Sequence, residues 1–249
     1  MRQYWKTGIY VLGACLLLFT YSCDKEPEPI DTSSFEYHYF PLDSGKFWIY
    51  KLDSTIVKQQ GAFIDSQSLY VKEEINEFYI SAAFDTVYVI ERSVSSNPNG
   101  PFSLQDLWTA ELLTESGFRV EENLRFQKMT FPLDLGKKWE GNLFDNLTEV
   151  QVASESVWVY KDWGDYEVIA KGVEHEVNGV VYSDVIVIQQ ADHDFIIETR
   201  YAVEYYAPHV GLIDKQMRVY DSQCDCPELS WEEKATAGFT LNQTLIDHN

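Results

Sequence analysis

The sequence predicts a mainly β protein, built as an antiparallel sheet that is curved or barrel-like, with little helix beyond a signal peptide. Apolar and polar residues alternate with a period of two in many short runs from Phe35 onward. β-Branched and aromatic residues dominate these runs, and turn-forming residues separate them. Because 45% of the 249 residues are apolar and 15% are aromatic, the chain can bury enough apolar surface to fold.

The period of two is clearest near the start of the expected domain. There Trp48, Tyr50 and Leu52 alternate with Ile49 and Lys51, as in a strand with one buried face. Other runs with strand composition are residues 78–84, 87–91, 157–160, 166–170, 185–188 and 196–200. The runs at 157–160 and 185–188 are continuously apolar, which is typical of strands covered on both faces.

Turn signals indicate where neighbouring strands connect. Asn178-Gly179 accepts positive φ at both turn positions and therefore predicts a tight hairpin. Residues 95–101 are rich in Ser, Asn, Gly and Pro and predict a longer loop. The segment 104–113 is ambiguous: Ser103 could cap a helix with rough leucine spacing, and a strand turning at residues 115–117 fits as well.

A repeated phrase is the most informative feature of the chain. Phe40–Trp48 returns as Phe131–Trp139 with seven of nine positions identical, 91 residues later. In each copy the proline keeps its predecessor extended, Asp-x-Gly-Lys makes a turn, and a tryptophan opens a strand. The residues that carry this structural role are Pro41, Gly45, Trp48, Pro132, Gly136 and Trp139. Two such units suggest related halves of the domain, residues 36–130 and 131–249.

The first 22 residues have the layout of a secretory signal peptide. Arg2 and Lys6 precede an apolar run at residues 7–20, and no acidic residue occurs before Asp24. The run is shorter than the roughly 20 apolar residues that span a bilayer. We expect cleavage before Cys23, where the apolar run ends, and acylation of that cysteine. Cys15 is the alternative, although cleavage there would leave an apolar stretch on the mature protein.

The residues after the cysteine predict a membrane-anchored domain. Residues 23–35 are acidic and proline-rich, which predicts a flexible tether, and residues 36–249 form the β-rich globular domain. Acyl chains bury many methylenes and so provide a stable anchor. The acidic segment also resembles the one that follows the cysteine in surface-exposed lipoproteins of the Bacteroidota. We therefore expect a cell-envelope protein on the outer membrane, facing the cell surface.

The net charge is −21, and removal of the basic leader makes the mature chain still more acidic. Such a domain repels phosphate backbones, which argues against nucleic-acid binding. No phosphate-cradling glycine loop, nucleophile elbow or zinc-protease motif occurs, so we expect no cofactor and no resident metal. The charge itself is typical of a soluble surface.

Beyond Cys23, two cysteines remain, Cys224 and Cys226. An exported domain meets an oxidising compartment, so we predict a local disulfide between them. A metal site is the weaker alternative, because two thiolates alone do not complete a structural zinc site and no histidine lies near in sequence.

Three phrases resemble an uncharacterised family of Bacteroidota cell-envelope lipoproteins. They are the Phe-Pro-Leu-x-x-Gly-x-x-Trp repeats, the hairpin at residues 177–185, and the segment Tyr-Tyr-Ala-Pro-His-Val-Gly-Leu-Ile at residues 205–213. The resemblance covers most of residues 36–220 and implies a curved or barrel-like antiparallel sheet in the cell envelope. It brings no catalytic residues. A fainter likeness, at the level of fold, is to periplasmic carriers of lipids and lipoproteins.

Few residues point to chemistry. His175 lies between two glutamates on a predicted strand, which favours a surface histidine, and Asp192-His193-Asp194 is typical of an acidic turn. The aromatic residues are more suggestive, because an exposed row of them would stack on sugar rings or line an apolar groove. The candidate binding aromatics are Trp158, Trp163, Tyr205 and Tyr206.

These observations favour a non-catalytic binding or structural domain on a lipid anchor. Its partners would be the membrane, through the anchor, and a glycan, an apolar ligand or another envelope protein. The alternative is a surface hydrolase that uses a carboxylate or metal site, which requires two acids, or an acid and His193, to converge in a pocket.

Overall fold

The structure, a computed structural model, describes residues 31–32, 34–59, 61–152 and 155–249. The predicted signal peptide (1–22), the lipidation site Cys23 and most of the tether (23–35) lie outside the described residues. The unit from Phe35 to Asn249 is built almost entirely of strands. In the first part of the chain these are β1 (Phe47–Lys58), β2 (Phe63–Ile80), β3 (Thr86–Ser95), β4 (Ser103–Leu112), β5 (Ser116–Glu121), β6 (Leu124–Thr130) and β7 (Lys138–Trp139). The later strands are β8 (Val150–Val152), β9 (Glu155–Val157), β10 (Tyr166–Val177), β11 (Val180–Asp194), β12 (Glu198–Ala207), β13 (Gly211–Ser222) and β14 (Ala235–His248).

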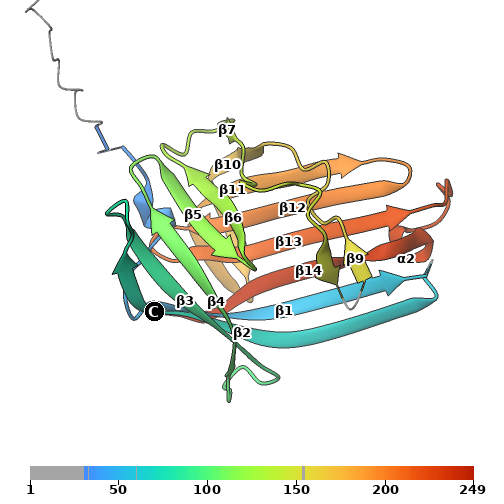
Figure 1. Cartoon of the computed structure of the whole chain (residues 1–249), viewed down its shortest axis with the longest axis horizontal. Helices are drawn as coiled ribbons and strands as arrows, with labels where there is room; N and C mark the ends of the chain where they lie inside the picture. Colours follow the sequence, from blue (N-terminus) through green and yellow to red (C-terminus); the bar gives the residue numbers. More distant parts are fainter. Residues whose placement is uncertain (1–30, 33, 60, 153–154) are drawn as a thin grey trace, which may run out of the picture. The chain divides into compact units, whose positions relative to one another are not determined.

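Twelve of these strands form one antiparallel sheet in the order β6-β5-β4-β3-β2-β1-β14-β13-β12-β11-β10-β7, and β8 pairs with β9. The sheet curves until its edges nearly meet: Gln127 N donates to Gly141 O (2.8 Å) and Leu143 N to Arg125 O (3.0 Å). In Figure 1 strands β3–β6 cross in front of β10–β13. The prediction of a curved, barrel-like antiparallel sheet is confirmed.

Helix is confined, in the described part of the chain, to the one-turn η2 (Tyr37–Tyr39) and to α2 (Trp231–Lys234). Ser230 and Glu233 form a capping box that starts α2. Neither of these described helices is long or apolar enough to cross a membrane.

The local turn predictions can be compared directly with the structure. Asn178 (φ 51°) and Gly179 (φ 82°) connect β10 to β11 in a tight hairpin, as predicted. The ambiguous segment 104–113 is strand β4, because it pairs with β3 on one side and β5 on the other. Helical leucine spacing there is coincidental: Leu104 and Leu107 remain exposed.

The two copies of the repeat form the same turn. Gly45 (φ 86°) and Gly136 (φ 80°) occupy the left-handed region that favours glycine. Gly45 N donates to Ile75 O (2.7 Å), and Gly136 N donates to Val168 O (2.8 Å). In both copies the following lysine N–H closes the turn onto the aspartate carbonyl, at 3.1 and 3.0 Å.

Each turn leads into a buried tryptophan. Trp48 Nε1 donates to Val210 O (2.6 Å), and Trp139 Nε1 donates to Gln127 O (2.8 Å). Trp48 belongs to the 12-residue β1 in the middle of the sheet, whereas Trp139 belongs to the two-residue β7 at its edge. The strands from residues 36–130 and 131–249 therefore share one sheet, and the division into two related halves stays a prediction.

The apolar core fills the space inside the curved sheet. Its centre near β10 is aromatic: Tyr160 packs edge-on to Trp163 (4.8 Å between ring centroids), and Tyr166 is fully buried. On another surface, the β10–β11 hairpin folds back over the sheet, where Asn178 Nδ2 donates to Leu245 O (2.7 Å). This wrapping explains why β12 and β13 are buried at most positions on both faces.

Candidate functional site

Charged side chains gather inside the curved sheet, where an apolar core would be expected. Strand alternation turns them inward from six strands, so that residues distant in sequence meet. We call this set the interior charge cluster; it consists of Glu73 (β2), Arg92 (β3), Arg119 and Glu121 (β5), Lys128 (β6), Glu204 (β12) and Lys215 (β13). Glu73, Lys128 and Glu204 are almost completely buried.

One part of the cluster is organised by Arg119. Its Nη2 lies 2.8 Å from Glu73 Oε2, and its Nε lies 3.4 Å from Glu121 Oε1. Arg92 approaches the other oxygen of Glu73 at 3.8 Å. The two guanidinium groups also lie over the ring of Trp108, at 4.6 Å for Arg92 and 5.3 Å for Arg119.

The other part is organised by Glu204. Its Oε1 accepts from Lys128 Nζ at 3.0 Å and lies 3.3 Å from Lys215 Nζ. Tyr206 OH donates to its second oxygen at 2.6 Å. Lys128 also lies 3.3 Å from Glu121, which joins the two parts into one network.

The pKa values in the cluster reflect this pairing. Burial alone would raise the pKa of Glu121, but the charges of Lys128, Lys215 and Arg119 outweigh it and hold that pKa well below its ordinary value. The pKa of Glu204 is lowered in the same way, because Lys128 and Lys215 outweigh the effect of burial. The pKa of Lys128 is raised, since Glu121 and Glu204 outweigh its burial. Glu121, Glu204 and Lys128 are therefore charged at neutral pH.

Two small cavities adjoin the cluster in the described part of the chain. One of about 30 Å³ lies between Trp48, Tyr50, Glu73 and Arg119, and one of about 20 Å³ lies between Glu121, Lys128, Glu204 and Lys215. A cavity of this size holds about one water molecule. The interior cluster can therefore tie the sheet together, but it has no room for a sugar or an acyl chain.

An open groove of about 380 Å³ lies beside β10 and β11. It brings together two acidic segments that are distant in sequence, within residues 162–165 and at residues 192–193. We call it the acidic groove; the residues that line it are Lys138, Asp162, Gly164, Asp165, Glu167, Gln189, Gln190, Ala191, Asp192 and His193.

Two side-chain nitrogen atoms of residues that line the acidic groove are buried and have no hydrogen-bond partner among the described residues. They are Nε2 of Gln190, a side chain that is 2% exposed, and Nε2 of His193. Burial and the nearby charge of Arg200 lower the pKa of His193, so its ring is neutral at pH 7. Within the described ranges no three His, Cys, Asp or Glu side chains are placed to hold a metal ion. The groove is thus lined by hydrogen-bonding groups, some of them unsatisfied.

The structure does not bring the four candidate binding aromatics together. Trp163 and Tyr206 are buried, and Trp158 is 45% exposed. Tyr205 lies on the opposite face of β12 from Glu204 and stacks on His175, with ring centroids 4.0 Å apart. Their role in binding stays a prediction, with Trp158 the most accessible of the set.

His175 is not the free surface histidine that its sequence neighbours favoured. Its Nε2 pairs with Asp214 Oδ2 at 3.0 Å, and Gln216 Nε2 donates to the same oxygen at 3.0 Å. The reason is tertiary: the β10–β11 hairpin folds over β13, so the outward face of the hairpin strand meets another strand. This contact fastens the hairpin to the sheet.

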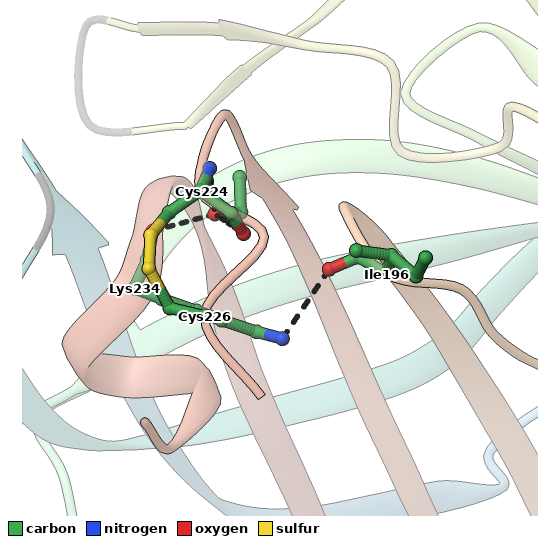
Figure 2. The surroundings of a disulfide bond; sticks show 5 residues. Ile196, Cys224, Cys226 and Lys234 are labelled. Carbon is green, nitrogen blue, oxygen red and sulfur yellow. Dashed lines mark hydrogen bonds between the residues drawn. A yellow bond between two sulfur atoms is a disulfide. The ribbon is translucent and has the colours of Figure 1, made fainter. Parts of the chain in front are cut away.

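Cys224 and Cys226 are joined as a disulfide in the loop between β13 and α2 (Figure 2). Ser222 Oγ accepts from Cys224 N at 3.0 Å, and Lys234 Nζ donates to Ile196 O at 3.3 Å. These contacts hold the loop and α2 beside the β11–β12 turn. The oxidised state in the cell stays a prediction.

Sequence reasoning missed the interior charge cluster. The available signal was weak: Glu73 and Glu204 each stand between apolar residues two positions away, on the face that should be buried. Alternation alone could have flagged them as inward charges, but it could not have paired them. Of the acidic segments of the groove, residues 192–194 stand out in the sequence as an acidic turn, and their meeting with residues 162–165 depends on the fold.

Comparison with known proteins adds little to these observations. No family profile matches the chain, and no curated protein matches it. A structure of a protein described as exported, with a YmcC-like fold, from Bacteroides fragilis is 9% identical, with a TM-score of 0.43 over 84% of this chain and 97% of that one. A structure of a protein described as a lipoprotein, from Parabacteroides distasonis, is 12% identical, with a TM-score of 0.43 over 85% of this chain and 98% of that one. A DUF1329 family protein from Desulfovibrio piger is 10% identical, with a TM-score of 0.20 over 83% and 86%.

Proposed function

We propose that this protein is a lipid-anchored protein of the bacterial cell envelope whose β-rich domain binds a glycan without transforming it. The anchor is supported by the basic and apolar leader that ends at Cys23 and by the acidic tether that follows. The acidic segment after the cysteine supports a place on the outer membrane, facing the cell surface.

The acidic groove is the observation that carries the binding role. Its volume of about 380 Å³ matches the lower range of small-ligand sites. Asp162, Asp165 and Asp192 offer acceptors, while Lys138 offers a donor. Sugar hydroxyls are both donors and acceptors, so a glycan satisfies both kinds of group. An apolar ligand would leave them unsatisfied, at a cost of about 1–3 kcal/mol each.

The interior supports a role without catalysis. Every glutamate of the interior charge cluster contacts at least one cation, so none of them is free to act as a general acid or base. The adjoining cavities hold about one water molecule each and admit no substrate. We assign this region a structural function.

A glycan microarray tests the binding role. The mature protein, purified in detergent from membranes, is compared with Asp165→Asn in the groove and with Glu174→Gln on an exposed strand as the matched loss of one carboxylate. We expect a defined subset of glycans to bind, and Asp165→Asn to weaken that binding about tenfold, as for one hydrogen bond to a charged group. Equal binding by both variants, or no bound glycan, contradicts the proposal.

The same experiment separates the hydrolase alternative, which the carboxylates and the neutral His193 in the groove keep in view. Bound oligosaccharides are recovered after incubation and examined by mass spectrometry. Intact oligosaccharides support binding alone, and shortened products that disappear in Asp165→Asn favour a hydrolase.

Mass spectrometry of the N-terminal peptide tests the anchor. An acylated peptide beginning at Cys23, absent in Cys23→Ala, is the expected result. Acylation at Cys15 or an unmodified N-terminus overturns the predicted cleavage position.

A further inference from the structure

The β2–β3 hairpin carries an exposed apolar tip beyond the edge of its neighbours. β2 pairs with β1 only as far as Glu74, but its pairing with β3 continues to Ile80. Phe78, Tyr79 and Ile80 lie in this extension and are more than half exposed, and Phe84 in the turn is 88% exposed. We call these four residues the hairpin tip. Four large apolar side chains gathered in solvent indicate an interaction site.

The turn of the hairpin is well ordered by its own hydrogen bonds. Ser81 Oγ accepts from the N–H groups of Ala83 and Asp85, both at 3.2 Å. Ser81 N also donates to Asp85 O at 2.9 Å, and Phe84 N donates to Ser81 O at 3.0 Å. The exposure of Phe84 is therefore a consequence of a closed turn, in which this residue takes positive φ (67°).

The hairpin tip lies at the end of the domain where the chain arrives from the tether. Tyr37 OH donates to Thr114 O at 2.6 Å, in the turn between β4 and β5. Thr114 and Asp85 line one open cleft of about 510 Å³, which places the β2–β3 turn next to that contact. Figure 1 shows the β2–β3 turn and the start of the domain at the same side of the sheet.

The tether is short enough to keep this end near a membrane. Residues 24–34 number eleven. Fully extended they span at most about 40 Å, and a flexible chain spans less. With the proposed lipid on Cys23, a tether of this length allows the hairpin tip to reach the bilayer surface.

We propose that the hairpin tip inserts into the headgroup and upper acyl region of the bilayer that holds the N-terminal lipid. This inference rests on the proposed anchor. Phenylalanine and tyrosine side chains are favoured at this depth of a bilayer. Glu77 and Asp85 flank the tip, so a zwitterionic surface suits it better than an anionic one.

Docking of the tip would also set the direction of the acidic groove. His193 is related to Asp65 on β2 by successive cross-strand pairing, so the two residues lie at the same level of the sheet. The intermediate partners are Arg200, Val219, Phe239 and Ile56. Asp65 and Ile80 are 15 residues apart on the same strand, which corresponds to about 50 Å along it. With the tip in the bilayer, the groove faces away from the membrane, toward its glycan.

Photocrosslinking to lipid tests the insertion. The acylated chain is reconstituted in phosphatidylcholine vesicles that contain phosphatidylcholine with a diazirine in its acyl chain, and crosslinked peptides are identified by mass spectrometry. We expect crosslinks within residues 78–84 and at least a tenfold loss in the variant Phe78→Ser, Ile80→Ser, Phe84→Ser. The matched control is Phe195→Ser, Ile196→Ser, Ile197→Ser, which removes an equally exposed apolar triplet from the turn at the other end and should change nothing.

Crosslinks at residues 195–197 as strong as those at 78–84, or no crosslink at 78–84 in a chain that floats with the vesicles, overturn the insertion while the anchor stands. A chain that fails to float contradicts the anchor instead. The tip is then tested with Cys23→Ala, held to nickel-chelating phosphatidylcholine vesicles by an N-terminal hexahistidine. Dimerisation that depends on the tip, measured by sedimentation, would assign the tip to a second copy and also overturn the proposal.

Discussion

The two copies of the Phe-Pro-Leu-Asp-x-Gly-Lys phrase make the same turn in two different places of the sheet. In the first copy the turn leads into β1, which lies between two long strands. In the second copy it leads into β7, which consists of two residues at an edge. Glycine conformation, the turn hydrogen bond and the buried indole donor agree between the copies. The local phrase therefore determines the turn and the buried tryptophan, whereas the rest of the chain determines the length of the strand that follows.

Trp48 borders the interior charge cluster, and Trp139 bonds to the strand that carries Lys128. Trp48 stands opposite Glu73 in the β1–β2 ladder, and Trp139 donates to the carbonyl next to Lys128. The difference between the copies is thus one of support: Trp48 is held by neighbouring strands on both sides, and Trp139 by one strand and the closing edge. Paired substitutions can measure that difference.

The largest effect is expected from removing the indoles. Trp48→Ala and Trp139→Ala each leave a cavity in the core, with an expected loss of about 3–5 kcal/mol in the free energy of unfolding. Trp48→Ala should lie at the upper end, because β1 is central. Urea unfolding followed by circular dichroism measures both. A loss in the free energy of unfolding below about 1 kcal/mol at either site would contradict the role of that indole in filling the core.

Acid should weaken the region between the two tryptophans. The pKa values of Glu121 and Glu204 are lowered in the folded protein, so their ionised forms contribute stability that is fully present above the ordinary carboxyl pKa of 4.5. This contribution, on the order of 2 kcal/mol, is lost as the pH falls below 4.5 toward the lowered pKa values.

The difference in fluorescence between the unaltered protein and each of Trp48→Phe and Trp139→Phe, recorded between pH 7 and pH 2, isolates the signal of that one indole among the seven tryptophans of the chain and shows whether both respond together. We expect the same midpoint in the two variants. A transition that is seen for only one of the two indoles would mean that the cluster does not connect Trp48 with Trp139.

A smaller and equal effect is expected at the two glycines. A Cβ on Gly45 or Gly136 meets no atom within 4 Å, so Gly45→Ala and Gly136→Ala test conformation alone. Each should lose about 1–2 kcal/mol because of positive φ. Gly164→Ala is the control, since it also has open space and its φ is not positive. Thermal unfolding should rank the control as neutral, and unequal losses at the two repeats would break the equivalence.

The smallest effect is expected at the lysines. Lys46 Nζ donates to His209 O and Asn249 O, whereas Lys137 Nζ donates to Phe131 O and Pro132 O within its own turn. Lys46→Met and Lys137→Met should each lose about 0.5–1.5 kcal/mol. Hydrogen exchange separates them, because only Lys46→Met should accelerate exchange in the last residues of β14. Equal exchange there in both variants would show that Lys46 does not hold the C-terminal end.

The contrast between the copies also marks how far the sequence predicts this protein. Period-two runs, the Asn178-Gly179 hairpin and the repeated turns are local patterns, and they predicted the antiparallel sheet. The segment 104–113 stayed ambiguous because short apolar runs fit either period. Lys128 and Glu204 are 76 residues apart, and their contact depends on sheet curvature that no local pattern encodes. The acidic groove depends on the same curvature, and so does the pairing of His175 with Asp214.

The pairing of β1 with β14 has a consequence for the order of events during biogenesis. Trp48 pairs with His248 across that ladder, so β1 cannot complete its pairing until β14 is present. Contacts of such long sequence separation form slowly and late. If the chain is exported from its N-terminus, as proposed above, it cannot complete this sheet until almost all of it has crossed the membrane.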